Sequence, residues 1–426
     1  MRTLRQSRWD AADLKARLCC ALDIAKRAVD FFAHEGYADS EVPENSFGPE
    51  KPIAETAMLL YTASTLRHLP DVAHRIEEIA QLLVPHARSQ RTLLNVALHP
   101  GVALDFAVPH VLLTKLGYCD PDFDNILKSC LSGQTQYGHE RPPFASVEQK
   151  WITSLWMGVE PGRNWRPDLL NSVMHRPLDI LGGPRQNAYG FTHLIMYCTD
   201  FGHRAGRFPR RRSVILDEAG SLLAKCLDEE DYDLAGELLM AWPLMGVHWS
   251  ASAAFGFRVL ARVEDQVGLL PGGTTRANRV NSLEGKERAQ YALGTAYHTA
   301  LVMGLLCAAA LRPGRAPSVW IIGPKYERAL LEQLLECIDR DQGHWQPELS
   351  ELTDSERNAL APLLLDIAIA QKCRKHQYEA VSQLLAAASQ HGMANSTLCG
   401  QAALLLERLA VCSQAVQAKW RGTGVS

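Results

Sequence analysis

The residues best suited to chemistry lie in residues 187–212, where polar side chains interrupt an otherwise apolar helical pattern. His193, Tyr197 and Asp200 are spaced at i, i+4 and i+7, so they share one face of a helix and neighbouring members can touch. This spacing predicts a short proton relay, with His193 as the proton carrier, Tyr197 as its hydrogen-bond donor and Asp200 as its orienter. It suits one metal ion less well, because residues seven apart lie roughly 10 Å apart along the axis.

Asp200 stands at the predicted end of this helix, just before Phe201 and Gly202. A negative charge at a helix C-terminus opposes the helix dipole, so we expect this carboxyl group to be paired or protonated. The alternative is structural: His193 and Tyr197 satisfy each other inside a helical core, and the basic loop that follows is solvated.

A second histidine follows a similar pattern later in the chain. The string AYHTALVMG at 296–304 echoes AYGFTHLIMY at 188–197, and we expect His298 to face His193 across a cavity. Chance similarity between helices is the alternative. Arginines in the two neighbouring loops are expected to hold an anionic group of the substrate: Arg204, Arg207, Arg276 and Arg279. The loop at 270–285 is expected to act as a lid or binding loop, or to be disordered.

Glu148 and Trp151 are predicted to contribute to substrate binding from the helical segment SVEQKWITSLWMG. The acid precedes the tryptophan by three residues, so both lie on one face of a short helix. Burial beside an aromatic wall raises a carboxyl pKa and makes the group a proton donor. The alternative interpretation of Glu148 is an ordinary surface acid.

Composition excludes several classes of protein. The 426 residues carry a formal net charge of −3, which gives no argument for binding nucleic acid or an anionic membrane. The most apolar stretch, 289–311, is interrupted by polar residues, and the N-terminus lacks the apolar core of a secretory signal, so we expect a cytoplasmic protein without a membrane partner. The 11 cysteines form no CxxC pair, which favours reduced, buried thiols.

The pattern of apolar residues predicts an all-α fold built from stacked helical hairpins. Three similar segments, at 120–131, 230–241 and 375–388, each place an aromatic residue and an acid before an apolar helix. We expect a closed α/α toroid or a compact irregular array, with an open helical-repeat solenoid as the alternative. Residues 1–426 are expected to form a single body, with at most a soft boundary near 158–187. Only 318–323 resembles a strand.

Several strings together resemble an uncharacterised family of bacterial all-helical proteins associated with biosynthetic gene sets. They are IAETAMLL, LGYCDPDFDNIL, the Glu148–Trp151 helix, THLIMYCTDFG and AYHTALVMGLL, and the resemblance covers about residues 50–400. It implies a helical fold and a biosynthetic setting, but it brings no known reaction or site residue with it.

The leading functional hypothesis is an enzyme that applies general acid–base chemistry to a small-molecule or carrier- or peptide-linked substrate, as a cyclase, isomerase or lyase. P-loop, HExxH and GxSxG motifs are missing, and we expect no cofactor and no metal ligand. One alternative is a noncatalytic scaffold that binds a peptide or protein on a concave face. Another is a metal- or haem-dependent oxygenase that uses His193 or His298 as a ligand. The sequence does not predict the oligomeric state.

Overall fold

The computed structural model describes residues 10–39, 41–132, 140–159, 165–339 and 343–422, and the ordered elements in these ranges are helices. No strand occurs among the described residues, including 318–323; the one β-type contact is an isolated bridge between Tyr37 and Phe47. The expected all-α fold is therefore confirmed. The expected strand is wrong, because 318–323 runs as irregular chain between two helices.

Polar caps and left-handed residues set the helix boundaries that matter for the site. Asp231 starts one helix by accepting a hydrogen bond from the amide of Leu234, and Ser250 starts another by accepting from Ala253. Gly158 and Gly246 end helices in the left-handed conformation, which glycine adopts without strain.

A closed ring of helices forms the inner layer of the protein. Each member packs against the next, and the last helix returns to the first; α9 reaches α11 both directly and through α12 (Ala241–Met245). The members are α2 (Glu50–Ala63), α5 (Ala103–Lys115), α7 (Pro143–Met157), α9 (Arg185–Thr199), α11 (Tyr232–Leu239) and α15 (Gly285–Ala310).

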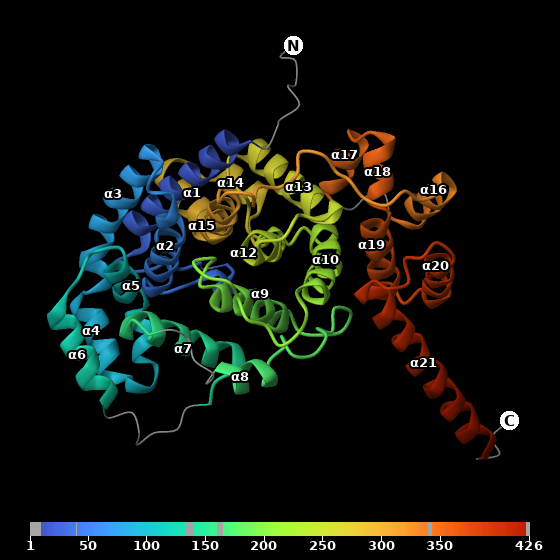
Figure 1. Cartoon of the computed structure of the whole chain (residues 1–426), viewed down its shortest axis with the longest axis horizontal. Helices are drawn as coiled ribbons and strands as arrows, with labels where there is room; N and C mark the ends of the chain where they lie inside the picture. The colour runs from blue at the N-terminus through green and yellow to red at the C-terminus, as the bar shows by residue number, and fades with distance from the viewer. Residues whose placement is uncertain (1–9, 40, 133–139, 160–164, 340–342, 423–426) are drawn as a thin grey trace, which may run out of the picture.

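A second layer of helices covers this ring from outside. Along the chain, outer helices alternate with inner ones, as expected for successive hairpins. The outer helices are α1 (Ala11–Phe32), α3 (Pro70–Ala87), α4 (Gln90–Leu98), α6 (Pro121–Ser132), α8 (Arg166–Asn171), α10 (Arg212–Asp228) and α13 (Ala251–Val267). The arrangement is the closed toroid rather than the open solenoid (Figure 1).

The remaining helices extend the protein on one side. Figure 1 shows α16–α21 in orange and red beside α10, with α21 pointing away from the ring. They are α16 (Arg328–Cys337), α17 (Trp345–Ser350), α18 (Asp354–Ala359), α19 (Ala361–Arg374), α20 (Tyr378–Gln390) and α21 (Thr397–Gly422). Both α19 and α21 pack on α10.

The predicted lid segment, 270–285, contains a short helix, α14 (Ala277–Ser282), that packs on α15. The Thr275 hydroxyl donates to the Thr295 carbonyl of α15 over 3.3 Å, and the amide of Arg276 donates to the Tyr291 hydroxyl over 3.2 Å. The segment is therefore attached to the ring at several points, and it has structure of its own.

One described helix, α15, is long and apolar enough to cross a membrane, but 83% of its apolar stretch is buried inside the protein. The chain from 90 to 115 passes the same test only if its two helices count as one span, and they are bent by 109°. Core helices commonly have this composition.

Small residues let α15 lie close against α1. A Cβ atom added at Gly304 would lie 2.5 Å from the Cβ atom of Ala21, well inside contact distance.

We therefore expect Gly304→Ala to lower the free energy of unfolding by about 1–3 kcal/mol through overpacking. The change should appear as a lower thermal unfolding midpoint. Gly220→Ala on α10 is the matched control, because its Cβ atom meets nothing within 4 Å and should be neutral or stabilising. Equal midpoints for the two variants would contradict this account of the packing.

A buried acid lies where α19 meets α10. The side chain of Asp366 accepts hydrogen bonds from Ser221 over 2.7 Å and Ser396 over 2.9 Å, and burial raises its pKa to about 6. Because the folded protein holds this proton more tightly than the unfolded chain, the associated stability is present at low pH and is lost as pH rises from about 4 through 6.

We expect Asp366→Asn to remove this loss and to stabilise the protein at pH 7 relative to the unmodified chain, by at most about 3 kcal/mol. Thermal midpoints measured from pH 4 to 7 check the prediction. Two pH profiles with the same shape would show that Asp366 is not the responsible group.

Candidate functional site

Most helices of the inner ring contribute an ionisable side chain to one connected cluster. His298 of α15 lies between two carboxylates, with Nδ1 3.0 Å from Oε1 of Glu55 on α2 and Nε2 3.2 Å from Oδ1 of Asp233 on α11. The side chain of His298 keeps 32% of its surface exposed, although its Nδ1 atom is buried. The cluster is therefore accessible although it lies within the ring.

Neighbouring charges shift the pKa values of the residues in this cluster. Burial alone would lower the pKa of His298, but the carboxylates of Glu55 and Asp233 outweigh it and raise that pKa well above its usual value. Burial would raise the pKa of Asp233, yet the neighbouring His298 lowers it to about 2. The pKa of Glu55 is likewise lowered, against burial, by the charge of His298.

Side chains of α9 orient the two acids of α11. The Tyr189 hydroxyl donates to Oδ2 of Asp233 over 2.6 Å, and the Thr192 hydroxyl donates to Oε2 of Glu237. The other oxygen of Glu237, Oε1, lies 3.5 Å from Nε2 of His193, whose side chain is 32% exposed. Burial would lower the pKa of His193, but Glu237 outweighs this effect and raises it.

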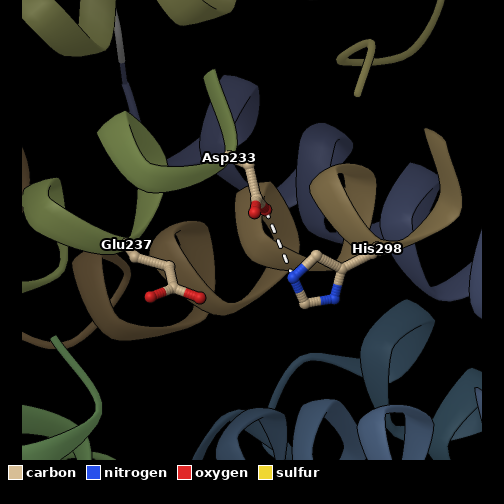
Figure 2. Close-up of side chains that lie close together, drawn as sticks. All are labelled: Asp233, Glu237 and His298. Atoms are coloured by element: carbon tan, nitrogen blue, oxygen red, sulfur yellow. Dashed lines mark ion pairs between the residues drawn. The ribbon is translucent and has the colours of Figure 1, made fainter. Parts of the chain in front are cut away.

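Ligand atoms of three cluster residues come close enough to share one ion. One atom each from Asp233, Glu237 and His298 lies within 4.8 Å of the others. Figure 2 shows the two carboxylates of α11, one helical turn apart, converging with the imidazole of α15. The leading hypothesis from the sequence included no metal ligand, the oxygenase alternative used His193 or His298 alone, and neither brought these three residues together.

Glu148 and Tyr197 form a second pair close to His193. The Tyr197 hydroxyl donates to Oε1 of Glu148 over 2.7 Å, and the tyrosine ring meets the ring of His193 edge-on, with centroids 5.9 Å apart. Burial raises the pKa of Glu148, although the hydrogen bond from Tyr197 partly opposes this rise. The pair therefore places a protonatable carboxyl group beside the cluster.

The predicted relay of His193, Tyr197 and Asp200 is not formed. Asp200 adopts the left-handed conformation, with φ 51°, and so ends α9. Its carboxylate accepts hydrogen bonds from the indole of Trp151 over 2.7 Å and from the Tyr61 hydroxyl over 3.1 Å. The common face expected from i, i+4 and i+7 spacing holds only while the backbone stays helical, and here the last residue leaves the helix.

Asp200 and Trp151 instead line a separate open pocket of about 270 Å³. Neither His193 nor His298 belongs to its lining, so the pocket that Asp200 lines is not the cavity predicted between the two histidines. The lining residues are Lys115, Trp151, Ser154, Leu155, Gly158, Val159, Asp200, His203 and Arg204.

Of the four predicted anion-binding arginines, Arg204 alone reaches this pocket. Its guanidinium donates to the carbonyl of Tyr197 over 3.2 Å and lies over the ring of Trp165 at 4.9 Å. It therefore helps to close the end of α9.

The other three arginines lie outside the cluster. Arg207 and Arg276 are exposed. Arg279 forms ion pairs with Glu41 over 2.7 Å and with Asp39 over 3.3 Å, so its charge is already balanced. Among the described residues, none of the four predicted arginines forms an ion pair with an acid of the cluster. The structure therefore gives no support for arginines that bind an anionic substrate group there.

Sequence reasoning missed the acids of the cluster. Asp233 and Glu237 are four residues apart in DYDLAGELLMA, and Glu55 interrupts the apolar string IAETAMLL. Acids embedded in an apolar helical run are a usable signal, because burying an unpaired charge is unfavourable. The similarity between 188–197 and 296–304 did point to two histidines of one cluster, because His193 and His298 both contact carboxylates of α11.

The fold and cluster define a closed toroid of helical hairpins with linked acids and histidines on its inner helices. The chain belongs to the family described as Domain of unknown function (DUF6895), whose model matches residues 20–308, more than half of the chain. The match runs from α1 into α15 and so contains the whole cluster. The comparisons found no matching curated protein and no matching solved structure.

The pair of Glu148 and Tyr197 gives a direct test of the site electrostatics. Tyr197→Phe removes the hydrogen bond that stabilises the charged carboxylate, so we expect the pKa of Glu148 to rise further. The protonated carbonyl band in infrared spectra, assigned with Glu148→Gln, should persist to higher pH. Tyr378→Phe, which alters an exposed tyrosine–histidine contact, is the control. An unshifted band would show that Tyr197 does not govern this carboxyl group.

Proposed function

We propose that the protein is an enzyme that acts on a small molecule at the inner face of the ring by general acid–base chemistry. The observation that carries the proposal is the pairing of accessible histidines with buried acids. His193 and His298 each keep 32% of their side-chain surface exposed, whereas Glu237 keeps 3% and Asp233 keeps 12%. A buried carboxylate that orients an accessible imidazole is the arrangement typical of proton-transfer sites.

The proposed roles follow from position. His193 takes a proton from the substrate, and Glu237 orients its ring and stabilises the imidazolium that forms. Glu148, whose pKa is raised by burial, returns a proton to the substrate, with Tyr197 holding its carboxyl group in place. Removal and return of a proton at different atoms describes an isomerase, a lyase or a cyclase.

The proposed site contains fewer residues than the sequence predicted. Asp200 is left out of the catalytic set because it lies in the separate pocket, and the anion clamp is left out because the four arginines lie elsewhere. The substrate class that remains is a small polar molecule, free or linked to a carrier or peptide. A bacterial biosynthetic role, a cytoplasmic location and the lack of nucleic-acid or membrane partners remain expectations from the sequence.

The scaffold alternative has less support. A peptide-binding scaffold of stacked hairpins offers a long concave face, and such a face belongs to an open array. Here α15 packs back on α2 and closes the ring among the described helices. A scaffold also gives no reason to keep paired charges at accessible positions.

The experiment incubates the full chain with fractionated metabolite extracts, with and without added divalent cations, and follows consumption by mass spectrometry. We expect His193→Gln and Glu148→Gln each to reduce turnover by at least about 100-fold, because each removes a proton-transfer group. Thermal midpoints should stay within a few degrees. His74→Ala, at an exposed position on α3, is the matched control and should turn over normally.

If turnover falls only in proportion to the fraction of folded protein, His193 and Glu148 have a structural role and not a catalytic one. Normal turnover by both variants would reject the proposed roles outright.

A further inference from the structure

We propose that Asp233, Glu237 and His298 bind a divalent transition-metal ion, of the zinc, manganese or iron(II) class. The proposal deepens the function proposed above and rests on it for the chemical use of the ion, although binding itself can be measured without a substrate. The leading hypothesis from the sequence included no metal ligand, and the oxygenase alternative named His193 or His298 as a ligand without any acid.

The spacing of the ligand atoms fits one ion. Asp233 and Glu237 lie at i and i+4 on α11, so both carboxylates leave the same face of the helix, and His298 approaches from α15 (Figure 2). Their ligand atoms lie within 4.8 Å of one another. Bonds of about 2.0–2.2 Å to one ion place ligand atoms about 3–4 Å apart, so small side-chain rotations complete the site.

The second oxygen of each carboxylate is already held. Tyr189 donates to Oδ2 of Asp233 and Thr192 donates to Oε2 of Glu237, which leaves Oδ1 and Oε1 to face the centre of the cluster. Asp233 as a whole residue is only 9% exposed, and its Oδ1 accepts no well-aligned hydrogen bond from the described residues. Oδ1 faces Nε2 of His298 at 3.2 Å, so an ion bound between these two atoms would take the place of their ion pair.

The histidine is held in the way that metal ligands usually are. Nδ1 of His298 lies 3.0 Å from Oε1 of Glu55, while Nε2 faces Asp233. A carboxylate on the far ring nitrogen is the common outer partner of a metal-bound histidine, because it fixes the ring orientation and makes the bound nitrogen more basic. The outer partners come from α2 and α9, so the ring of helices shapes the site.

Charge balance favours a divalent ion over a proton. Three carboxylates, Glu55, Asp233 and Glu237, face two imidazoles, His193 and His298, which supply at most two positive charges to offset them. A divalent cation supplies two charges at the point where Asp233 and Glu237 converge. His193 lies 3.5 Å from Glu237 and would therefore stand beside a bound ion.

The ligand set defines the class of ion. Two carboxylate oxygens with one imidazole nitrogen suit zinc, manganese or iron(II) better than magnesium or calcium, which prefer oxygen ligands throughout. Three protein ligands leave positions for water or substrate, as in catalytic rather than structural sites. Such an ion would polarise a substrate oxygen or lower the pKa of a bound water molecule.

The test uses the full chain after treatment with a chelator and removal of the chelator. Co²⁺ serves as a spectroscopic probe, and Zn²⁺ and Mn²⁺ are titrated by calorimetry. We expect one equivalent of Co²⁺ to bind with visible d–d absorption. Glu237→Gln and His298→Gln should each weaken binding by at least about 100-fold, and Glu55→Gln, which loosens an orienting contact, by about 10–100-fold. His344→Ala removes an exposed histidine paired with Glu230 and should bind as the unmodified chain does.

Circular dichroism checks that each variant is folded; if His298→Gln fails to fold, the comparison rests on Glu237→Gln and Glu55→Gln, which keep the size of the side chain. Absence of a stoichiometric site in the unmodified chain would overturn the proposal. Equal affinity in Glu237→Gln would also overturn it, because the ion would then lie elsewhere.

The metabolite assay separates this proposal from the proposed function. Metal binding without turnover of any metabolite would leave the ion site standing and reject the enzyme. Turnover by the chelated protein, together with no metal binding, would leave the acid–base enzyme standing and reject the ion site.

Discussion

The contact of His298 with Glu55 and Asp233 is the interaction on which the inner face of the ring depends. Its three residues come from α15, α2 and α11, which are distant in sequence, and α15 is the helix that closes the ring. Breaking a buried ion pair by removing one partner typically costs about 3–5 kcal/mol, because the other charge is left unpaired. The position of these charges is therefore tied to closure of the ring.

The polar cluster is not what makes the ring stable. The apolar side of α15 packs on α1 through Gly304 and Ala21, and a well-packed apolar face supplies stability without the desolvation penalty of buried charge. His298 lies six residues before Gly304, which corresponds to a rotation of about 240° around the helix. One side of α15 therefore holds the protein together, while another carries the charged groups, and this division favours a functional explanation for the cluster.

Local patterns predicted the helices and their hairpin order, because helical periodicity and helix ends are set by nearby residues. They also brought His193 and His298 to the same cluster through the repeated Ala-Tyr string. The acids were missed because an acid in an amphipathic helix is ordinarily exposed, and only ring closure shows that Asp233 faces inward. The relay failed for a local reason, since the left-handed turn at Asp200 cannot be read from i, i+7 spacing.

The family match shows which part of the chain contains the charged cluster. Residues 20–308 contain every side chain of the cluster, whereas α16–α21 contribute none among the described residues. The C-terminal helices dock on α10 through buried polar contacts: Asp228 accepts a hydrogen bond from Gln371 over 2.6 Å and pairs with Arg374 over 2.9 Å. Because α10 is an outer helix, this docking leaves the inner face unchanged. The cluster therefore lies within the part of the chain that the family model matches, and α16–α21 are better placed to support the outer wall than to contribute side chains to the inner face.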